Sequence, residues 1–313
     1  MSRFLSKQWL EKSLFAVMLL AIGLVFTFTN LLQRWDRSIY DLLSGGAVRT
    51  PPDDIVIISI DETSLARFGR WPWPRHIHAG LIDKLSRGGA KVIGFDIVLA
   101  EADLIAPEDD QSLAVAIARS GRVILPIICE GRPGKPLRLT PPLPEFAGVA
   151  AGLGHLVFEL DSDGIMRRAF LKAGLGSPDW PDFALAMLRF NDPAFAENLP
   201  GVRNKNLHSA SPINWVRDYE VLVPFADAPG FFPRISYAHF LEADFDADIV
   251  RDKFVFVGAT ALGLGDALPT PVSGETVPMP GVEINANLLD ALRTGIVIEP
   301  LGVTQTLLLT CFL

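Results

Sequence analysis

Apolar residues form one long uninterrupted run near the N-terminus and several short runs further along the chain. From Leu14 to Leu32 there are 19 residues without a charge. As a helix this run is about 28 Å long, close to the thickness of a bilayer's hydrocarbon core. A cleaved signal peptide would have a shorter apolar region followed by small residues, whereas this run ends in FTFTNLL. The pattern therefore predicts a transmembrane helix over residues 14–32.

The charges around this run predict its orientation. Arg3, Lys7 and Lys12 precede it, whereas the basic residues that follow are offset by Asp36 and Asp41. Because positive charge favours the cytoplasmic side, residues 1–13 are expected in the cytoplasm. The rest of the chain is then expected outside the cell membrane.

Two further segments flank the central region. Residues 33–50 carry Trp35, Ile39 and Leu42 at helical spacing and predict a juxtamembrane helical connector. Residues 301–313 are uncharged but too short to span a bilayer. We expect them to be the start of a truncated second transmembrane helix, in a chain that continues into a cytoplasmic portion. A short apolar tail packed on the domain is the alternative.

Between these flanks the hydrophobic pattern switches between strand and helix periods. Apolar, β-branched runs predict strands over 53–61, 91–99 and 122–129, and amphipathic runs predict helices over 76–90 and 109–121. Strands that alternate with helices and are apolar throughout are typical of βαβ units around a parallel sheet. The first part of the domain is therefore expected to hold such a sheet.

The remaining pattern is more varied. Residues 152–174 predict a β-hairpin that turns at Asp163-Gly164, and residues 191–232 predict irregular structure in which only 221–225 could form a strand. Helices are expected over 181–190, 235–243 and 280–295, and a strand over 253–260. The whole predicts one α/β domain over residues 51–300, with a mostly parallel sheet flanked by helices and an inserted β-hairpin.

The composition of the chain excludes some classes of protein and of partner. Hydrophobic residues make up 49% of the 313 residues and the net charge is −8, which excludes a disordered chain. An acidic balance also argues against nucleic acid as a partner, because phosphate contacts need clustered Lys and Arg. Cys129 stands alone in the central domain and Cys311 lies in the apolar tail, so no disulfide is expected within the domain.

Candidate ligand-binding residues gather after the predicted strands. In an open α/β sheet, ligands bind outside the carboxyl ends of the strands. The candidates at or near those ends are Asp61, Glu62, Trp71, Trp73, Arg75, His78, Asp96, Glu101 and Thr260. Two structural roles compete with this hypothesis. Asp61 and Asp96 could cap backbone amides or pair with Arg75, and the tryptophans could pin their proline-rich loop against the sheet.

A catalytic role is the weaker hypothesis. Asp61, Glu62 and Asp96 could serve a membrane-anchored extracytoplasmic hydrolase. However, His76 and His78 are two residues apart and face different sides of a helix, so they do not form a metal pair. The chain has no GxSxG elbow, no Walker loop and no GxGxxG after its first strand. We therefore expect no metal, no cofactor and no enzymatic activity in this segment.

Four motifs in order, GRWPWPR, FDIVLAE, FVFVGAT and PGVEINAN, carry a family resemblance. Over roughly residues 35–300 the chain resembles the CHASE family of bacterial extracytoplasmic sensory domains, specifically its second type. One departure stands in PGVEINAN, since the family usually has His where this chain has Asn285 or Asn287.

The resemblance implies a sensor of a transmembrane receptor, with its sensory domain on the periplasmic side of the cell inner membrane. An adenylate or guanylate cyclase is the effector expected beyond the chain, and a sensor histidine kinase is the alternative. The implied partners are an unknown small extracytoplasmic ligand or an envelope protein, and a second copy of the chain in a homodimer. A ligand-free envelope or assembly protein is a further alternative, favoured if the strand ends hold no pocket but expose apolar side chains.

Overall fold

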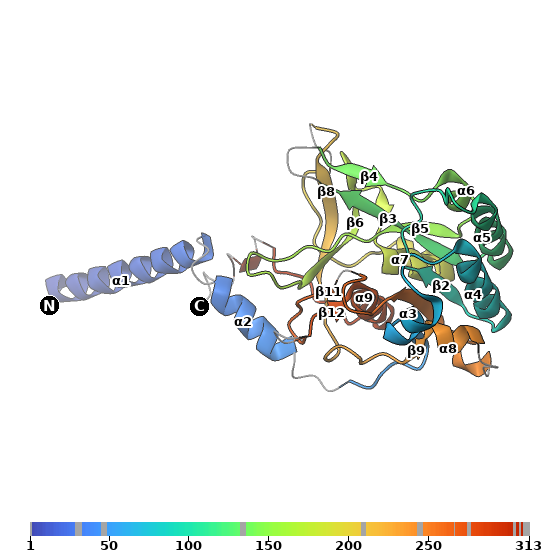
Figure 1. Ribbon diagram of the computed structural model, residues 1–313. Helices are drawn as coiled ribbons and strands as arrows, with labels where there is room; N and C mark the ends of the chain where they lie inside the picture. The colour runs from blue at the N-terminus through green and yellow to red at the C-terminus, as the bar shows by residue number, and fades with distance from the viewer. Residues whose placement is uncertain are drawn as a thin grey trace. The chain divides into compact units, whose positions relative to one another are not determined.

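The chain forms two compact units, Met1–Gly46 with Pro300–Leu313, and Ala47–Glu299. The computed structural model describes residues 2–28, 33–44, 49–131, 136–207, 211–242, 247–265, 267–273, 277–302, 305, 306 and 308. Each unit is considered by itself. Figure 1 shows the elements by label.

The terminal unit is helical. Helix α1 (Ser2–Phe28) contains the described part of the predicted span, and residues 29–32 lie outside the described residues. Helix α2 (Gln33–Ser44) confirms that the connector is helical up to residue 44, and residues 45–48 lie outside. Within the described residues, no helix is both long enough and apolar enough to cross a membrane. Most of 301–313 also lies outside them, so the second membrane helix stays a prediction.

The central unit holds a seven-stranded sheet within its described residues, which confirms the predicted α/β class. Along the path β4-β3-β2-β10-β1-β9, all neighbours are parallel except β4, and β5 pairs with β3 in parallel. The strands are β1 (Ile55–Ile60), β2 (Val92–Phe95), β3 (Val123–Glu130), β4 (Arg138–Thr140), β5 (Gly152–His155), β9 (Arg234–Ser236) and β10 (Phe254–Ala259). The predicted strands 53–61, 122–129 and 253–260 are confirmed as β1, β3 and β10, and 91–99 is longer than β2.

Helices cover both faces of this sheet. On one face α4 (Arg75–Arg87) and α5 (Pro107–Ser120) lie side by side, and α7 (Phe183–Asn191) and α9 (Gly281–Thr294) contribute to the core on the other (Figure 1). These four helices confirm the predictions over 76–90, 109–121, 181–190 and 280–295. The shorter helices are α3 (Glu62–Phe68), α6 (Pro144–Ala147) and α8 (Tyr237–Glu242), with 3₁₀ turns at Pro193–Ala196 and Ala247–Ile249.

The strands bury alternate side chains in two separate cores. Ile55 and Ile57 of β1 join the core that contains α7 and α9 residues, whereas Val56, Ile58 and Ile60 join the core that contains α4 and α5 residues. Strand β10 divides in the same way. Burying one such side chain contributes about 1.5–3 kcal/mol. Both faces are therefore apolar, as parallel sheets require.

A second, antiparallel sheet corrects the prediction for residues 191–232. Its order is β7-β6-β8, with β6 (Arg168–Leu175), β7 (Trp180–Pro181) and β8 (Trp215–Leu222). The charged residues of β8 hid its alternation of buried and less buried positions. A short pair, β11 (Ala267–Leu268) and β12 (Met279–Pro280), lies apart from both sheets.

The predicted hairpin over 152–174 was right at its turn and wrong in its strands. Gly164 has φ +82° and its N–H donates to the Asp161 carbonyl at 2.8 Å, which is the turn that Asp-Gly favours. However, β5 pairs with β3 in the main sheet, and the main partner of β6 is β8. Strand pairing over such distances along the chain is decided by tertiary packing.

Gly258 should be required for the approach of α9 to β10. A Cβ atom at Gly258 would lie 2.8 Å from the Cβ of Val282, which is too close for two packed carbons. We expect Gly258→Ala to lower the free energy of unfolding by about 1–3 kcal/mol, measured by urea denaturation. The control is Gly80→Ala in α4, where the nearest atom would be 3.8 Å away and helix propensity favours alanine by about 1 kcal/mol. Equal effects of both substitutions would contradict the close approach.

Candidate functional site

The carboxyl ends of β1, β10 and β2 are neighbours, as the ligand-site hypothesis requires. The N–H of Thr260 donates to the Ile60 carbonyl at 3.0 Å, and the N–H of Asp96 donates to the Val257 carbonyl at 2.8 Å. Both residues are half-buried. The backbone therefore brings Asp61, Asp96 and Thr260 to one edge of the sheet.

Asp61 caps helix α3 at this edge. Its Oδ1 accepts hydrogen bonds from the Ser64 N–H at 2.9 Å, the Ser64 hydroxyl at 2.6 Å and the Ser236 hydroxyl at 2.9 Å. The Ser64 hydroxyl in turn accepts from the Ala238 N–H at 3.1 Å. Asp61 thus joins the start of α3 to β9 and α8. Glu62 is exposed in the first turn of α3, where a negative charge favours the helix.

The tryptophans pack on one another and on the sheet. Trp73 is buried, and its indole N–H donates to the Gly69 carbonyl at 3.0 Å. Trp71 is half-buried, and its ring centroid lies 5.2 Å from that of Trp73 in an edge-on arrangement. The rings that contact them are Phe68, His78 and Tyr237. This packing favours a pinned loop, because Trp73 is buried and both indole rings contact neighbouring aromatic side chains.

His78 is fully buried in the same cluster. Its Nδ1 lies 2.8 Å from the Tyr237 hydroxyl, and its Nε2 has no hydrogen-bond partner among the described residues. Burial, followed by the charges of Arg75 and His76, lowers the pKa of His78 to about 3. The imidazole is therefore neutral at physiological pH. His76, in contrast, is exposed and its Nδ1 lies 2.6 Å from Asp109, so the two histidines do face different surroundings.

Arg75 holds the loop that follows β2. Its Nε lies 3.4 Å from the Asp110 carboxylate, and its Nη2 donates to the Glu101 carbonyl at 3.3 Å. The Glu101 side chain is exposed. In the described part of the chain, no three His, Cys, Asp or Glu side chains form a group that could hold a metal ion. Ligand binding at this edge therefore stays a prediction, since the contacts described there are those of a packed and capped structure.

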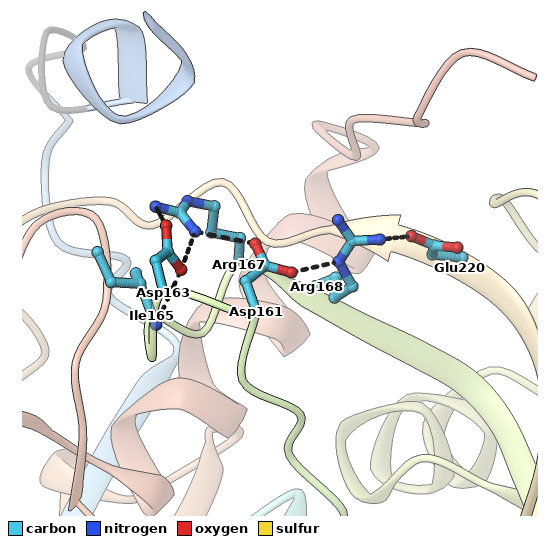
Figure 2. A network of polar contacts seen from close by, with 6 residues as sticks. All are labelled: Asp161, Asp163, Ile165, Arg167, Arg168 and Glu220. Carbon is cyan, nitrogen blue, oxygen red and sulfur yellow. Dashed lines mark hydrogen bonds and ion pairs between the residues drawn. The ribbon is translucent and has the colours of Figure 1, made fainter. Parts of the chain in front are cut away.

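Two adjacent arginines, Arg167 just before β6 and Arg168 at its start, are both paired with carboxylates, as Figure 2 shows. Arg167 is buried and lies 2.9 Å from Asp161 and 3.0 Å from Asp163. Arg168 lies 2.9 Å from the other Asp161 oxygen and also pairs with Glu220 of β8. The DSDG turn is thus tied to both long strands of the small sheet by charge.

A groove that the sequence did not indicate lies on this small sheet. Its volume is about 650 Å³, within the usual range for small-molecule sites. It is lined by Phe170 of β6, by residues 202–206, and by Asn214 to Asp218 and Glu220 on and beside β8. Because β8 itself was not predicted, no sequence signal could have assembled these residues.

Removing the Asp61 carboxylate should destabilise the domain. Asp61→Ala loses three hydrogen bonds to Oδ1, and we expect a loss of about 1–2 kcal/mol in the free energy of unfolding, measured by urea denaturation. Asp61→Asn keeps an oxygen acceptor and should lose less than half as much. If both variants were as stable as the wild type, Asp61 would not be a helix cap.

His78 should make the domain less stable in acid. Below pH 6.5 an unfolded histidine gains a proton that buried His78 takes up only near pH 3, so stability falls as pH falls. Between pH 7.5 and 5 this contribution amounts to about 2 kcal/mol. His78→Phe should flatten the pH dependence of the unfolding free energy by that amount.

The control for His78 is His239→Gln at an exposed position of α8, which should change the pH dependence much less than His78→Phe does. The wild type and both variants contain two other buried groups with shifted pKa values. Burial lowers the pKa of His155 to about 4 and raises the pKa of Asp182 to about 7. Their contributions cancel in the comparison. An unaltered slope in His78→Phe would show that His78 is protonated in the folded state.

Residues 16–313 match the CHASE2 domain family. No curated protein matches the chain, and no solved structure does. The match covers nearly the whole chain and includes the strand-end loops, the small sheet and α9. CHASE2 domains are extracytoplasmic sensory domains found in cyclases and histidine kinases, and they are sensory rather than catalytic. The chain belongs to the CHASE2 family.

Proposed function

We propose that this chain is the extracytoplasmic signal-input module of a bacterial transmembrane receptor. It relays the binding of a small ligand or an envelope protein to a cytoplasmic effector. The observation that carries this proposal is the family match over residues 16–313, which extends through the predicted membrane helix and connector. A nucleotide cyclase is the preferred effector, and a histidine kinase is the alternative.

The central unit joins its two ends to each other, which supports a relay. Arg293, at the end of α9, pairs with Asp54, which directly precedes β1. Arg49 donates to the Pro224 carbonyl at 3.2 Å, and the Leu222 N–H donates to the Ile298 carbonyl at 2.8 Å. These contacts connect the interior of the unit to the segments where the chain enters it and leaves it.

The membrane location rests on the predicted span and on the apolar surface of α1. Leu14, Phe15 and Val17 have exposed fractions of 61%, 58% and 63%. Such side chains favour an apolar surrounding. With the basic residues before the span, this supports an inner-membrane protein whose sensory domain is periplasmic.

The other functions have less support. An anchored hydrolase would need Asp61 free for chemistry, but Asp61 caps α3. A protein contact at the strand-end edge has some support, because Leu104, Ile105 and Leu262 have exposed fractions of 91%, 97% and 88% on loops after the neighbouring strands β2 and β10. Exposed apolar side chains that gather in one patch can mark a protein contact. It agrees with a homodimer or with an envelope partner.

The proposed topology can be tested with reporter fusions. Green fluorescent protein at the N-terminus should fluoresce, since residues 1–13 are cytoplasmic. Alkaline phosphatase fused after Gly302 should be active, since that enzyme folds only outside the cytoplasm. The matched control, alkaline phosphatase fused after Gln8, should be inactive.

An inactive phosphatase after Gly302 would overturn the extracytoplasmic placement. The two effectors are then distinguished in membranes that hold the complete protein. A cyclase forms cyclic nucleotide from ATP or GTP, whereas a histidine kinase incorporates phosphate from ATP into an acid-labile phosphohistidine. If the membranes form neither cyclic nucleotide nor phosphohistidine, both effector assignments are contradicted.

A further inference from the structure

The groove on the small sheet has two kinds of wall. Phe170 and Trp215 supply aromatic surface from β6 and β8, and residues 202–206 supply a polar rim. Behind the groove, the Trp215 ring lies 6.0 Å from buried His155, edge to face. An aromatic floor with a few polar groups around it is typical of sites for small organic molecules.

The charges around the groove leave one cation without a partner. The lining residues include three cations, Arg203, Lys205 and Arg217, and two anions, Asp218 and Glu220, so their net charge is 3 − 2 = +1. Arg203 pairs with buried Asp218 at 3.0 Å, and Asn204 and Tyr219 donate backbone N–H groups to the same carboxylate. Arg217 pairs with Glu159, and Glu220 pairs with Arg168.

Lys205 is exposed, and no described residue pairs with it. In a chain whose net charge is −8, a local positive balance over an aromatic floor favours a ligand with one negative charge and an apolar body. A dianion would leave one charge unmatched, because the arginines are already neutralised. A single carboxylate on an apolar molecule fits this balance.

Tyr219 is a strained residue at the groove. Its φ is +56°, in the left-handed region that non-glycine residues rarely adopt. It lies in β8 between Asp218 and Glu220, both of which line the groove. Strain of this kind costs about 1–3 kcal/mol and is concentrated at binding and switch sites.

Residues adjacent to the rim and to the groove-lining part of β8 contact the exit of the domain. Residue Gly201, just before the rim, donates its N–H to Glu299 at 2.7 Å, and Val202 and Glu220 exchange backbone hydrogen bonds of 2.9 Å. Further along β8, the Leu222 N–H bonds to the Ile298 carbonyl. A ligand that moves the rim or β8 therefore acts on residues 298 and 299, where the central unit ends.

From these observations, and resting on the proposed sensory function, we propose that the groove between residues 202–206 and β8 is the ligand site. It takes a small organic monoanion with an apolar body, and its occupancy is relayed to the exit segment through Gly201–Glu299 and Leu222–Ile298.

Binding can be tested on the 313-residue chain in lipid nanodiscs by isothermal titration calorimetry. The probes are benzoate, phenylacetate and 4-hydroxybenzoate, each beside its neutral amide. At least one carboxylate should bind, and its amide should bind at least tenfold more weakly. Lys205→Gln and Trp215→Ala should each weaken the carboxylate at least tenfold. Arg70→Gln, an exposed cation at the strand-end edge, should change its affinity less than twofold.

The relay has a separate readout. Bound carboxylate should slow hydrogen exchange at residues 296–302 in the wild type. In Glu299→Ala, which removes the acceptor of the Gly201 N–H, the affinity should stay within twofold, while this protection is reduced. Binding without protection of the exit segment in the wild type would overturn the relay.

If no carboxylate binds, or if Lys205→Gln and Trp215→Ala leave the affinity unchanged, the groove is not the site. A loss that follows Arg70→Gln instead would assign binding to the strand-end edge. Calorimetry does not depend on topology or on an effector. A negative calorimetry result at the groove therefore does not contradict the proposed function. Negative results from the topology reporters likewise do not affect the binding result.

Discussion

Strands β1, β10 and β2 lie at the centre of a sheet that is buried on both faces, and every other part of the domain is placed by that burial. Alternate residues of β1 enter two different cores, so the sheet needs helices on each side to keep both sets from water. Helices α4 and α5 cover one face, and α7 and α9 cover the other. Gly258 then matters because only a residue without a Cβ lets α9 come close enough to β10.

Polar residues inside this architecture hold segment ends in place. Glu283 of α9 is fully buried and accepts hydrogen bonds from the Gly230 and Phe231 N–H groups while it pairs with Arg234. Burial raises the pKa of Glu283, and Arg234 and the backbone donors oppose that rise. Asn287 accepts from the Ala226 N–H at 2.9 Å and donates to the Glu283 carbonyl. Through Glu283 and Asn287 the PGVEINAN motif therefore fastens residues 226–234, and these hydrogen bonds offset the cost of burying a carboxylate and an amide.

The two sheets suit different parts of the family's sensory role. The parallel sheet is buried on both faces, and the small sheet carries a groove, a tyrosine with positive φ and the contacts to the exit. Signal transmission requires an element whose arrangement a ligand can bias. In our proposal strand β8 is that element, since it lines the groove and its Leu222 N–H bonds to the Ile298 carbonyl near the end of the domain.

The sequence alone determined the α/β class, the main parallel strands, the four long helices of the domain and the family resemblance. These features depend on local periodicity and on motifs, which can be recognised in the linear sequence. It also offered capping as a role for Asp61, and the Ser64 and Ser236 contacts show that Asp61 caps α3. Tertiary structure alone decided the place of β10 between β1 and β2, the pairing of β6 with β8, and the groove at Lys205 and Trp215. Contacts between residues far apart in the chain leave no local pattern, and the charges of β8 obscured the alternation that would have marked it as a strand.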